Sequence, residues 1–211
     1  MRLIIAVDGP AASGKGTIAK ALARHYGLPH LDTGLLYRAV GLHTITHGGD
    51  PDSEADAIKG CAFPDELLTH PELRTEAVGG LASRVSRHPS VRAALLERQQ
   101  TFAAQPGGAV LDGRDIGTVI APGADAKLFV TGGLEVRAAR RLAEMHGRGL
   151  VATLDEIVAD LTARDSRDSG RDTAPLARAA DAALLDTSDL TIEDAVRQAI
   201  ALVDAQLGGL R

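Results

Sequence analysis

Short apolar runs alternate with longer amphipathic stretches along the whole chain. Runs of three to five residues are typical of buried parallel strands, whereas the intervening stretches repeat their apolar positions at helical spacing. The pattern predicts strands at Leu3–Val7, His30–Asp32, Ala109–Asp112, Ala126–Val130 and Ala182–Asp186. It predicts helices at Lys15–Tyr26, Gly34–Thr46, Glu72–Arg87, Ser90–Ala104, Leu134–Gly147, Leu154–Arg167 and Ile192–Gln206.

This alternation predicts an α/β fold in which crossover helices connect the strands of a parallel sheet. The segment Gly48–Pro71 is rich in Gly, Pro, Asp and Glu, with a short helical pattern at Ala55–Lys59, so we expect a surface excursion there. The length of 211 residues suits one domain with smaller mobile parts. No stretch approaches the ~18 apolar residues of a spanning helix, so we expect a soluble protein without a membrane partner.

Residues Gly9–Thr17 carry the strongest chemical signal. They read Gly-Pro-Ala-Ala-Ser-Gly-Lys-Gly-Thr and lie between the first predicted strand and the first predicted helix. Gly9 and Gly14 allow a tight turn whose backbone N–H groups converge on phosphate oxygens, and the helix N-terminus adds positive potential. Lys15 would reach the β- and γ-phosphates. This setting favours a phosphate-binding loop over a glycine-rich turn with a solvent-facing lysine.

A second group of polar residues, Asp112-Gly113-Arg114-Asp115, follows the third predicted strand. Open α/β sheets bind ligands at the carboxyl ends of their strands. Asp112 would act on the Mg²⁺ side of a phosphate site, and Arg114 would clamp a phosphate with two hydrogen bonds. A turn that satisfies only backbone groups explains part of this string, but not two carboxylates flanking an arginine.

A third group, Arg164–Arg171, places three arginines within eight residues, where a helical pattern dissolves into a polar loop. One interpretation is a mobile lid that neutralises phosphate charge and excludes water. The other is a solvated helix end with weak, interleaved ion pairs. Arg137, Arg140 and Arg141 on the preceding predicted helix are weaker candidates for the same role.

Composition narrows the class of protein further. The formal charge of -5 argues against a general binder of nucleic acids, because such proteins carry a basic excess. The single cysteine excludes an internal disulfide, which fits a reducing cytosol. Two tyrosines, three phenylalanines and no tryptophan make an aromatic platform for stacking bases improbable.

Taken together, these strings resemble bacterial cytidylate kinase, within the nucleoside monophosphate kinases. The glycine-rich loop is shared by many kinases, whereas the strings after Asp112 and Arg164 are more specific. The matching pieces are Asp8–Thr17, Leu31–Gly34 with Tyr37-Arg38, Ser83 with Pro89–Arg98, Asp112–Val119, and Arg164–Arg171 leading to Ala174-Pro175-Leu176.

The resemblance implies a five-stranded parallel sheet flanked by helices, the P-loop NTPase fold, with nucleoside monophosphate-binding (NMP-binding) and lid subdomains in one kinase domain. The expected core comprises 1–33, 105–135 and 172–211, the NMP-binding part about 34–104, and the lid about 136–171. The small antiparallel sheet usually inserted in the NMP-binding part is expected to be shortened, because Gly48–Arg74 alternates too little.

The resemblance also implies ATP-dependent phosphorylation of CMP and dCMP to CDP and dCDP, in pyrimidine metabolism in the cytoplasm. The expected partners are these small molecules and Mg²⁺, with no nucleic-acid polymer and a monomeric protein. Lys15, Arg114, Arg164 and Arg171 would supply catalytic charge. Donor phosphates would bind Gly9, Pro10, Ala11, Ala12, Ser13, Gly14, Lys15, Gly16 and Thr17, with Thr17 holding the metal directly or through water.

By the same resemblance, Ser83, Arg92 and Asp115 would recognise cytosine, whose edge offers one donor and two acceptors. Ser83 and Arg92 also have a plain structural alternative as exposed helical residues. The acceptor phosphate would be held by Arg38, Arg114 and Arg171, with Thr33 nearby, and the sugar by Arg164 and Asp168.

Three other functions stay open from the residues alone. The first is a related kinase that acts on UMP or AMP. The second is a GTP-operated switch, although the guanine-reading N-K-x-D string is absent. The third is a nucleotide-binding regulatory subunit without turnover.

Overall fold

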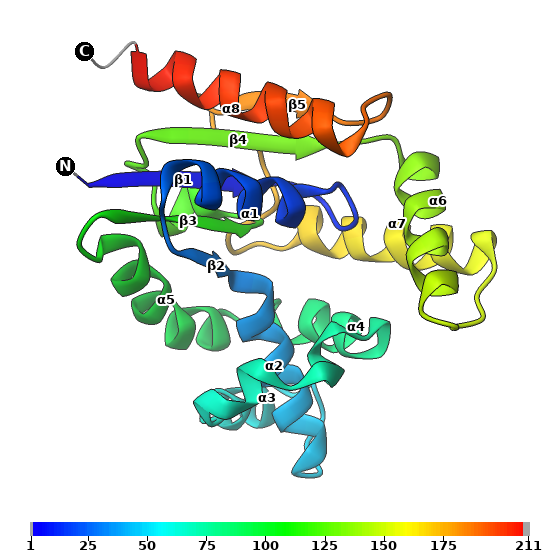
Figure 1. Ribbon diagram of the computed structural model, residues 1–211. Helices are drawn as coiled ribbons and strands as arrows, with labels where there is room; N and C mark the ends of the chain where they lie inside the picture. Colours follow the sequence, from blue (N-terminus) through cyan, green and yellow to red (C-terminus); the bar gives the residue numbers. More distant parts are fainter. Residues whose placement is uncertain (1, 209–211) are drawn as a thin grey trace. The chain divides into compact units, whose positions relative to one another are not determined.

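Five parallel strands form the central sheet of the structure, a computed structural model that describes residues 2–208 (Figure 1). The strand order is β2-β3-β1-β4-β5, so the first strand lies in the middle and the chain crosses over between neighbours. This arrangement confirms the predicted fold class. The strands are β1 (Leu3–Asp8), β2 (His30–Asp32), β3 (Gly108–Gly113), β4 (Ala126–Thr131) and β5 (Ala183–Asp186).

The helices largely follow the predicted pattern, but the stretch predicted as a single helix from Glu72 to Arg87 is divided. A 3-10 turn ends at Arg74, and a new helix begins at Glu76, because the Thr75 hydroxyl caps it by accepting a hydrogen bond from the N–H of Val78 at 3.4 Å. The helices are α1 (Lys15–Tyr26), α2 (Thr33–Thr46), α3 (Glu54–Gly60), η1 (Asp65–Thr69), η2 (Pro71–Arg74), α4 (Glu76–Val85), α5 (Pro89–Ala104), η3 (Ile116–Ile120), α6 (Leu134–Gly147), α7 (Leu154–Gly170) and α8 (Ile192–Gly208).

The chain divides into two compact units, residues 32–102 and the remainder, which contains nearly all of the sheet. In the sheet unit, Ile5 and Val7 of β1 are fully buried and pack with Leu22 of α1 and Val203 of α8. Alternate residues of a strand point to opposite faces, so α1 and α8 cover one face of the sheet. The loops on which the candidate site is built follow the carboxyl ends of the strands.

The unit of residues 32–102 is helical and has its own apolar core. Leu36 and Val40 of α2 pack with Leu73 of η2 and Val78 of α4. In the described structure the segment 48–75 holds α3 and two 3-10 turns and contributes no strand. The shortened insertion expected from its weak alternation is therefore what the structure has.

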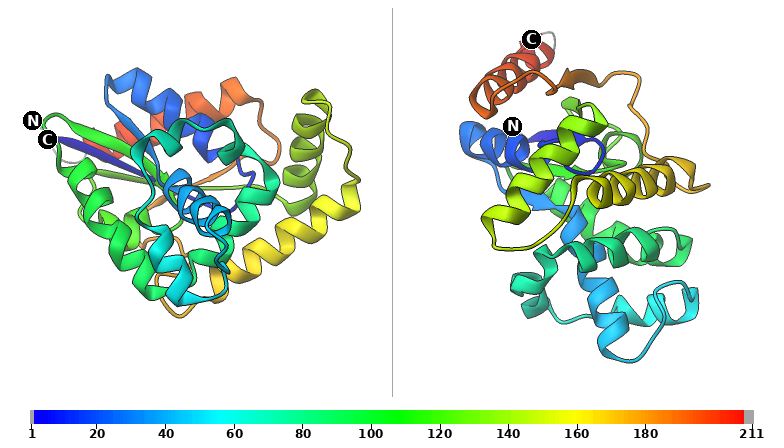
Figure 2. Two further views of the ribbon diagram at one scale, coloured as in Figure 1. Left: turned by 90° about the horizontal axis from the view of Figure 1, so that it is seen from below. Right: turned by 90° about the vertical axis from the view of Figure 1, so that its right-hand side faces the viewer.

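Helices α6 and α7 form a pair within the sheet unit (Figure 2). Ala138 of α6 packs with Ile157 and Leu161 of α7 and with Ala11 of the phosphate-binding loop. The sequence pattern predicts that α7 ends at Arg167 and dissolves into a polar loop within Arg164–Arg171. That prediction is wrong, because the helix continues to Gly170. Arg164 and Asp168 lie one turn apart and are both buried, so tertiary contacts stabilise the last turn despite its polarity.

Gly107, just before β3, and Gly108, its first residue, allow a matched test of how close the backbones of β1 and β3 lie. Both have positive φ, but a Cβ at Gly108 would lie 2.0 Å from the carbonyl oxygen of Leu3, whereas a Cβ at Gly107 would meet no atom within 4 Å. We expect Gly107→Ala to lower the free energy of unfolding by ~1–2 kcal/mol, since it strains only the backbone. Gly108→Ala is expected to cost a further ~1–3 kcal/mol or more through the steric clash. Urea unfolding of both variants measures the difference, and equal values would contradict the close approach.

Candidate active site

The loop between β1 and α1 has the backbone shape of an anion-binding turn. Gly9 lies so close to β4 that a Cβ there would be 2.0 Å from the carbonyl oxygen of Val130. Ala12 and Gly14 both adopt positive φ, of 58° and 85°, and Gly14 is the cap residue before α1. Successive turns of this kind direct N–H groups toward one point, at the positive end of the helix dipole. The loop predicted to bind phosphates thus has the required conformation.

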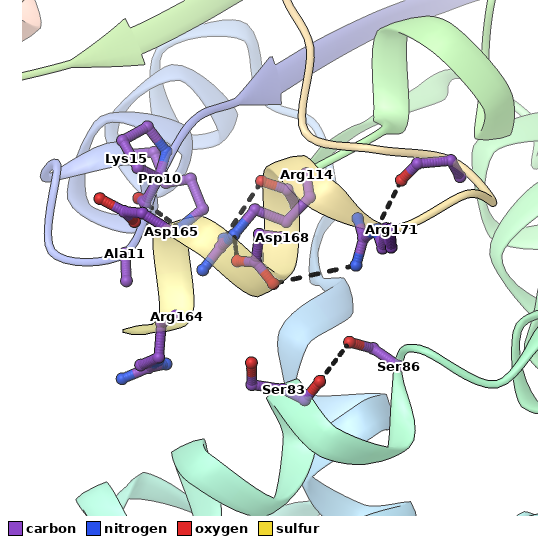
Figure 3. A network of polar contacts seen from close by, with 12 residues as sticks. Pro10, Ala11, Lys15, Ser83, Ser86, Arg114, Arg164, Asp165, Asp168 and Arg171 are labelled. Atoms are coloured by element: carbon purple, nitrogen blue, oxygen red, sulfur yellow. Dashed lines mark hydrogen bonds and ion pairs between the residues drawn. The ribbon is translucent and has the colours of Figure 1, made fainter. Parts of the chain in front are cut away.

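Side chains from the rest of the sheet unit hold this loop in place. Arg137 of α6 is buried and donates to the carbonyl oxygens of Ala11, at 2.9 Å, and Gly132, at 2.8 Å, and to the carboxylate of Asp165, at 2.7 Å. Within the loop, the ammonium group of Lys15 lies 3.4 Å from the carbonyl oxygen of Pro10 (Figure 3). Arg137 therefore connects the phosphate-binding loop to α7. Its role here is to position the loop, whereas the sequence made it only a weaker candidate for neutralising phosphate charge.

Asp112 lies at the end of β3, next to the first turn of α1. Its carboxylate is 2.8 Å from Nε2 of His30 on β2, and its other oxygen would be 3.6 Å from a Cβ built at Gly16. Asp112 is only 3 % exposed. A carboxylate thus lies beside the phosphate-binding loop, as the sequence predicted, whereas the histidine beside it was missed.

The buried carboxylate of Asp168 brings two of the predicted arginines together. Its oxygens lie 2.7 Å from Nε of Arg114, which follows β3, and 3.9 Å from Nη1 of Arg171, at the end of α7 (Figure 3). Arg171 is held further by donating from Nε to the carbonyl oxygen of Ala174 at 2.7 Å. Two groups of residues that are far apart in the sequence therefore meet in one compact unit.

Positive charge is concentrated around this carboxylate. Burial alone would raise the pKa of Asp168, but the guanidinium groups of Arg114, Arg171 and Arg164 outweigh burial and hold that pKa below its ordinary value. Burial, followed by repulsion from Arg114, lowers the pKa of Arg164. Like charges in a buried region repel, so this arrangement favours binding of an anion with more than one negative charge.

The predicted residues at 32–102 lie within the helical unit. Thr33 is buried in the first turn of α2. Arg38, one turn further on, donates from Nη1 to the carbonyl oxygens of Leu73, at 2.7 Å, and Thr75, at 2.8 Å. Arg38 thus also stabilises the η2 segment, and its contact with an acceptor phosphate stays a prediction.

Ser83 and Arg92 are both 7 % exposed, so the alternative that they are solvent-facing helical residues is wrong. Both are tied to Ser86, whose hydroxyl donates to the carbonyl oxygen of Ser83 at 3.1 Å (Figure 3). Arg92 donates to the carbonyl oxygen of Ser86 at 3.4 Å, and its guanidinium lies 5.5 Å from the ring centre of Tyr37. The helical unit therefore holds a buried hydroxyl and a buried guanidinium in one cluster.

A cavity of about 460 Å³ opens beside the phosphate-binding loop, on the side of α6 and α8. Arg140 lines it and donates to the hydroxyl and the carbonyl oxygen of Thr187, at 2.9 Å and 2.5 Å, at the end of β5. The hydroxyl of Thr187 contacts the carbonyl oxygen of Ser13 at 3.2 Å. The cavity thus has a phosphate-binding loop on one wall and an otherwise mostly apolar lining, which suits the base and sugar of a nucleotide.

Comparison with known proteins decides the family. The profile of the cytidylate kinase family matches residues 5–205. The chain belongs to the cytidylate kinase family. It is 56% identical over 208 residues to a cytidylate kinase of Xanthobacter autotrophicus, covering 98% of this chain and 100% of the relative. It is 53% identical over 212 residues to a cytidylate kinase of a Caulobacter species, covering 99% and 98%.

Membership of the cytidylate kinase family makes the chain a phosphotransferase that uses ATP as phosphoryl donor. The GTP-operated switch and the regulatory subunit without turnover are therefore excluded. Within residues 2–208, none of the helices combines the length and the apolar character needed to cross a membrane.

Solved structures that resemble this one support the fold alone. A gluconokinase from Sinorhizobium meliloti superposes with a TM-score of 0.56 at 16% identity, covering 100% of this chain and 97% of its own. A protein from Eubacterium ventriosum superposes with a TM-score of 0.58 at 14% identity, covering 97% and 99%.

The residues around Asp168 yield a prediction about stability and pH. Asp168→Asn removes the charge that compensates Arg114 and Arg171, so we expect the free energy of unfolding at pH 7 to fall by ~3–5 kcal/mol. Because the pKa is lower in the folded state, the carboxylate stabilises the fold above its usual pKa of 3.8 and loses that effect as pH falls through the folded-state value. The difference between variant and wild type should therefore be constant above pH ~5 and shrink below pH ~4.

The matched control is Asp160→Asn on the same helix. Asp160 pairs with Arg164 at 3.5 Å but is 45% exposed, so its loss should cost at most ~1 kcal/mol. Urea unfolding across the pH range measures both variants. Equal effects of the two substitutions would contradict the buried role of Asp168.

Proposed function

We propose that the protein transfers the γ-phosphoryl group of ATP to CMP or dCMP, producing ADP and CDP or dCDP, as a step of pyrimidine metabolism in the cytoplasm. The proposal is carried by one observation: a phosphate-binding loop and a cluster of arginines around the buried carboxylate of Asp168 belong to the same compact unit. The cytidylate kinases that share more than half of this sequence support the cytosine assignment.

On the donor side, the N–H groups of residues 9–17 would bind the ATP phosphates and Lys15 would contact the β- and γ-phosphates. The adenosine would occupy the cavity beside Arg140. The lining supports this, because the loop approaches it from one side and apolar atoms provide most of the remaining surface.

The oxygen ligands beside the loop fit Mg²⁺. The hydroxyl of Thr17 is exposed in the first turn of α1, and the carboxylate of Asp112 lies near Gly16, so both are hard oxygen donors of the type Mg²⁺ prefers. Thr17 would hold the ion directly or through water, while phosphate oxygens and water complete the shell. Bound Mg²⁺ would neutralise charge on the donor phosphates.

The reaction itself needs alignment and charge stabilisation rather than covalent help from the protein. An oxygen of the CMP phosphate attacks the γ-phosphorus of ATP, a new P–O bond forms, and the bond to the β–γ bridging oxygen breaks to release ADP. Negative charge spreads over the transferred group during this step. Lys15, Arg114, Arg164 and Arg171 would stabilise that charge, and their placement before the substrate binds avoids reorganisation during the reaction.

On the acceptor side, Ser83, Arg92 and Asp115 would bind the cytosine edge, which presents an amino donor, a carbonyl oxygen and a ring nitrogen. Arg38, Arg114 and Arg171 would hold the acceptor phosphate, with Thr33 nearby, and Arg164 with Asp168 would contact the sugar. The burial of Ser83 and Arg92 supports this role, since a buried polar group is retained where it has a partner.

The two compact units fit the division of labour between donor and acceptor. Residues 32–102 would form the NMP-binding part, and α6 with α7 would form the lid over the phosphates. We propose that the protein works as a monomer.

The assay that tests the proposed function measures ADP formation from Mg·ATP with CMP, dCMP, UMP, AMP, GMP or dTMP, and without acceptor. We expect strong stimulation by CMP and dCMP alone, because only cytosine presents an amino donor, an acceptor ring nitrogen and a carbonyl oxygen side by side on one edge. Stimulation by UMP or AMP instead would replace the cytosine assignment with the related kinase that the sequence leaves open.

The role of the phosphate-binding loop is tested with Lys15→Ala. We expect kcat to fall at least ~100-fold while the fold is kept, because one preorganised charge at the transferred group is lost. Lys20→Ala is the control, since Lys20 is an exposed lysine on the same helix. Steady-state kinetics and circular dichroism of both variants provide the comparison, and near-normal turnover of Lys15→Ala would rule out the assigned role.

A further inference from the structure

Asp8, the last residue of β1, is a buried carboxylate that has no role in the proposed reaction. It is 5 % exposed and directly precedes Gly9 of the phosphate-binding loop. Both of its oxygens accept backbone hydrogen bonds, one from the N–H of Ile116 at 2.8 Å and the other from the N–H of Gly117 at 2.7 Å. A single side chain thus connects the donor side of the sheet to the segment that follows Arg114 and Asp115.

The segment that Asp8 holds is a tight turn directly after the two predicted acceptor residues. Within η3, the carbonyl oxygen of Asp115 accepts hydrogen bonds from the N–H groups of Val119, at 2.9 Å, and Ile120, at 3.1 Å. These bonds fix the turn internally but do not attach its first residues to the sheet. The attachment at Ile116 and Gly117 comes from Asp8, so the position of Asp115 relative to β1 depends on that carboxylate.

The turn packs closely against Asp8 on one side and Lys127 of β4 on the other. A Cβ at Gly117 would lie 3.3 Å from the Asp8 carboxylate and 3.2 Å from Cδ of Lys127. The ammonium group of Lys127 is itself held by the carbonyl oxygen of Pro122, at 2.6 Å, and by Asp181, at 2.7 Å. A Cβ at Gly117 would force the Asp8 carboxylate, the Lys127 side chain or the turn to shift by a few tenths of an ångström.

The phosphate-binding loop, by contrast, has anchors that do not involve Asp8. Gly9 fits closely against Val130, Arg137 holds the carbonyl oxygen of Ala11, and Thr187 holds that of Ser13. Loss of the Asp8 carboxylate would therefore loosen the turn after Asp115 more than it loosens the loop.

Burying a carboxylate costs free energy, because the charged group loses its hydration. Burial raises the pKa of Asp8 to about 6, the two N–H donors and Arg114 counteract this, and the charge of Asp115 adds to it. An apolar residue of similar size would avoid that cost. The carboxylate is therefore better explained by the geometry that it imposes than by stability.

We propose that Asp8 is a positioning residue for the acceptor side, acting through the backbone of Ile116 and Gly117 to set Arg114 and Asp115 against the phosphate-binding loop. This inference rests on the proposed function, in which those two residues contact the monophosphate. It predicts that loss of the carboxylate impairs use of the monophosphate and leaves use of ATP nearly unchanged.

The test is the kinetics of Asp8→Asn with the monophosphate that the wild-type enzyme phosphorylates. We expect the KM for that acceptor to rise at least ~5-fold, because the amide cannot accept both N–H groups, while the KM for ATP changes less than ~2-fold. A second variant, Gly117→Ala, disturbs the same contact from the side of the turn and should give the same asymmetric change.

The control is Asp125→Asn, because Asp125 directly precedes β4 and contacts the opposite end of β1 from Asp8. Asp125 also accepts a backbone hydrogen bond, from the N–H of Ile4 at 2.8 Å. The Asp125→Asn variant should therefore have a lower free energy of unfolding, without a larger change in the KM for the acceptor than in the KM for ATP.

The pH profile separates positioning from a purely structural role. The Asp8 carboxylate becomes protonated as pH falls through about 6, and the acid can no longer accept both N–H groups. The charged groups that act on it are Asp115 and Arg114, with Lys127 packed against the same turn. The ratio of acceptor KM between Asp8→Asn and wild type should be large at pH 8 and fall toward one as the pH drops below 6. Taking the ratio at each pH cancels the ionisation of the substrate.

Two results would overturn the inference: equal changes in both KM values for Asp8→Asn and Gly117→Ala, or a KM ratio that does not vary with pH. A wild-type enzyme that prefers another monophosphate would refute the cytosine assignment alone, because the acceptor for these assays is the one that wild type uses. Failure of the inference would thus appear in the kinetics of the variants, whereas failure of the cytosine assignment would appear in the acceptor preference of the wild-type enzyme.

Discussion

The arrangement of the site depends on a buried carboxylate that holds like charges together. Arg114 follows β3 and Arg171 follows α7, and the carboxylate of Asp168 lies between them. Without a negative group, guanidinium ions in a buried region would repel each other and draw the end of α7 away from β3. With it, the protein keeps a concentrated positive charge in place before any phosphate arrives, which is the condition for electrostatic catalysis without reorganisation.

Backbone carbonyls and N–H groups account for the other connections of the site. Arg137 reaches from α6 to the phosphate-binding loop and to α7, and Arg140 reaches from the same helix to the end of β5. Asp8 attaches the turn after Asp115 to β1. Each is a charged side chain that bonds main-chain groups, so each fixes the path of a loop rather than the identity of its residues. The loops at the carboxyl edge of the sheet are thereby positioned together.

Much of the fold and part of the site were predictable from the sequence. Strand and helix positions follow from the spacing of apolar residues, because a buried strand and an amphipathic helix each require their own period. The loop at Gly9–Thr17 was predictable because its glycines and its lysine act locally, between one strand and the next helix. The helix break at Thr75 was missed because a single hydroxyl cap decided it, and the extension of α7 to Gly170 was missed because its last turn is polar.

The sequence by itself determined the positions of the strands and helices, the phosphate-binding loop and the short strings that resemble the cytidylate kinases, since each depends on residues near one another in the chain. Tertiary structure alone decided which polar groups pair with one another. His30 with Asp112, Asp8 with Gly117, and Arg114 with Asp168 are pairs separated by 82, 109 and 54 residues. A sequence does not distinguish a charged side chain that is exposed to water from one that pairs with another group. Only the packed fold, by removing water from around these groups, makes their pairing necessary.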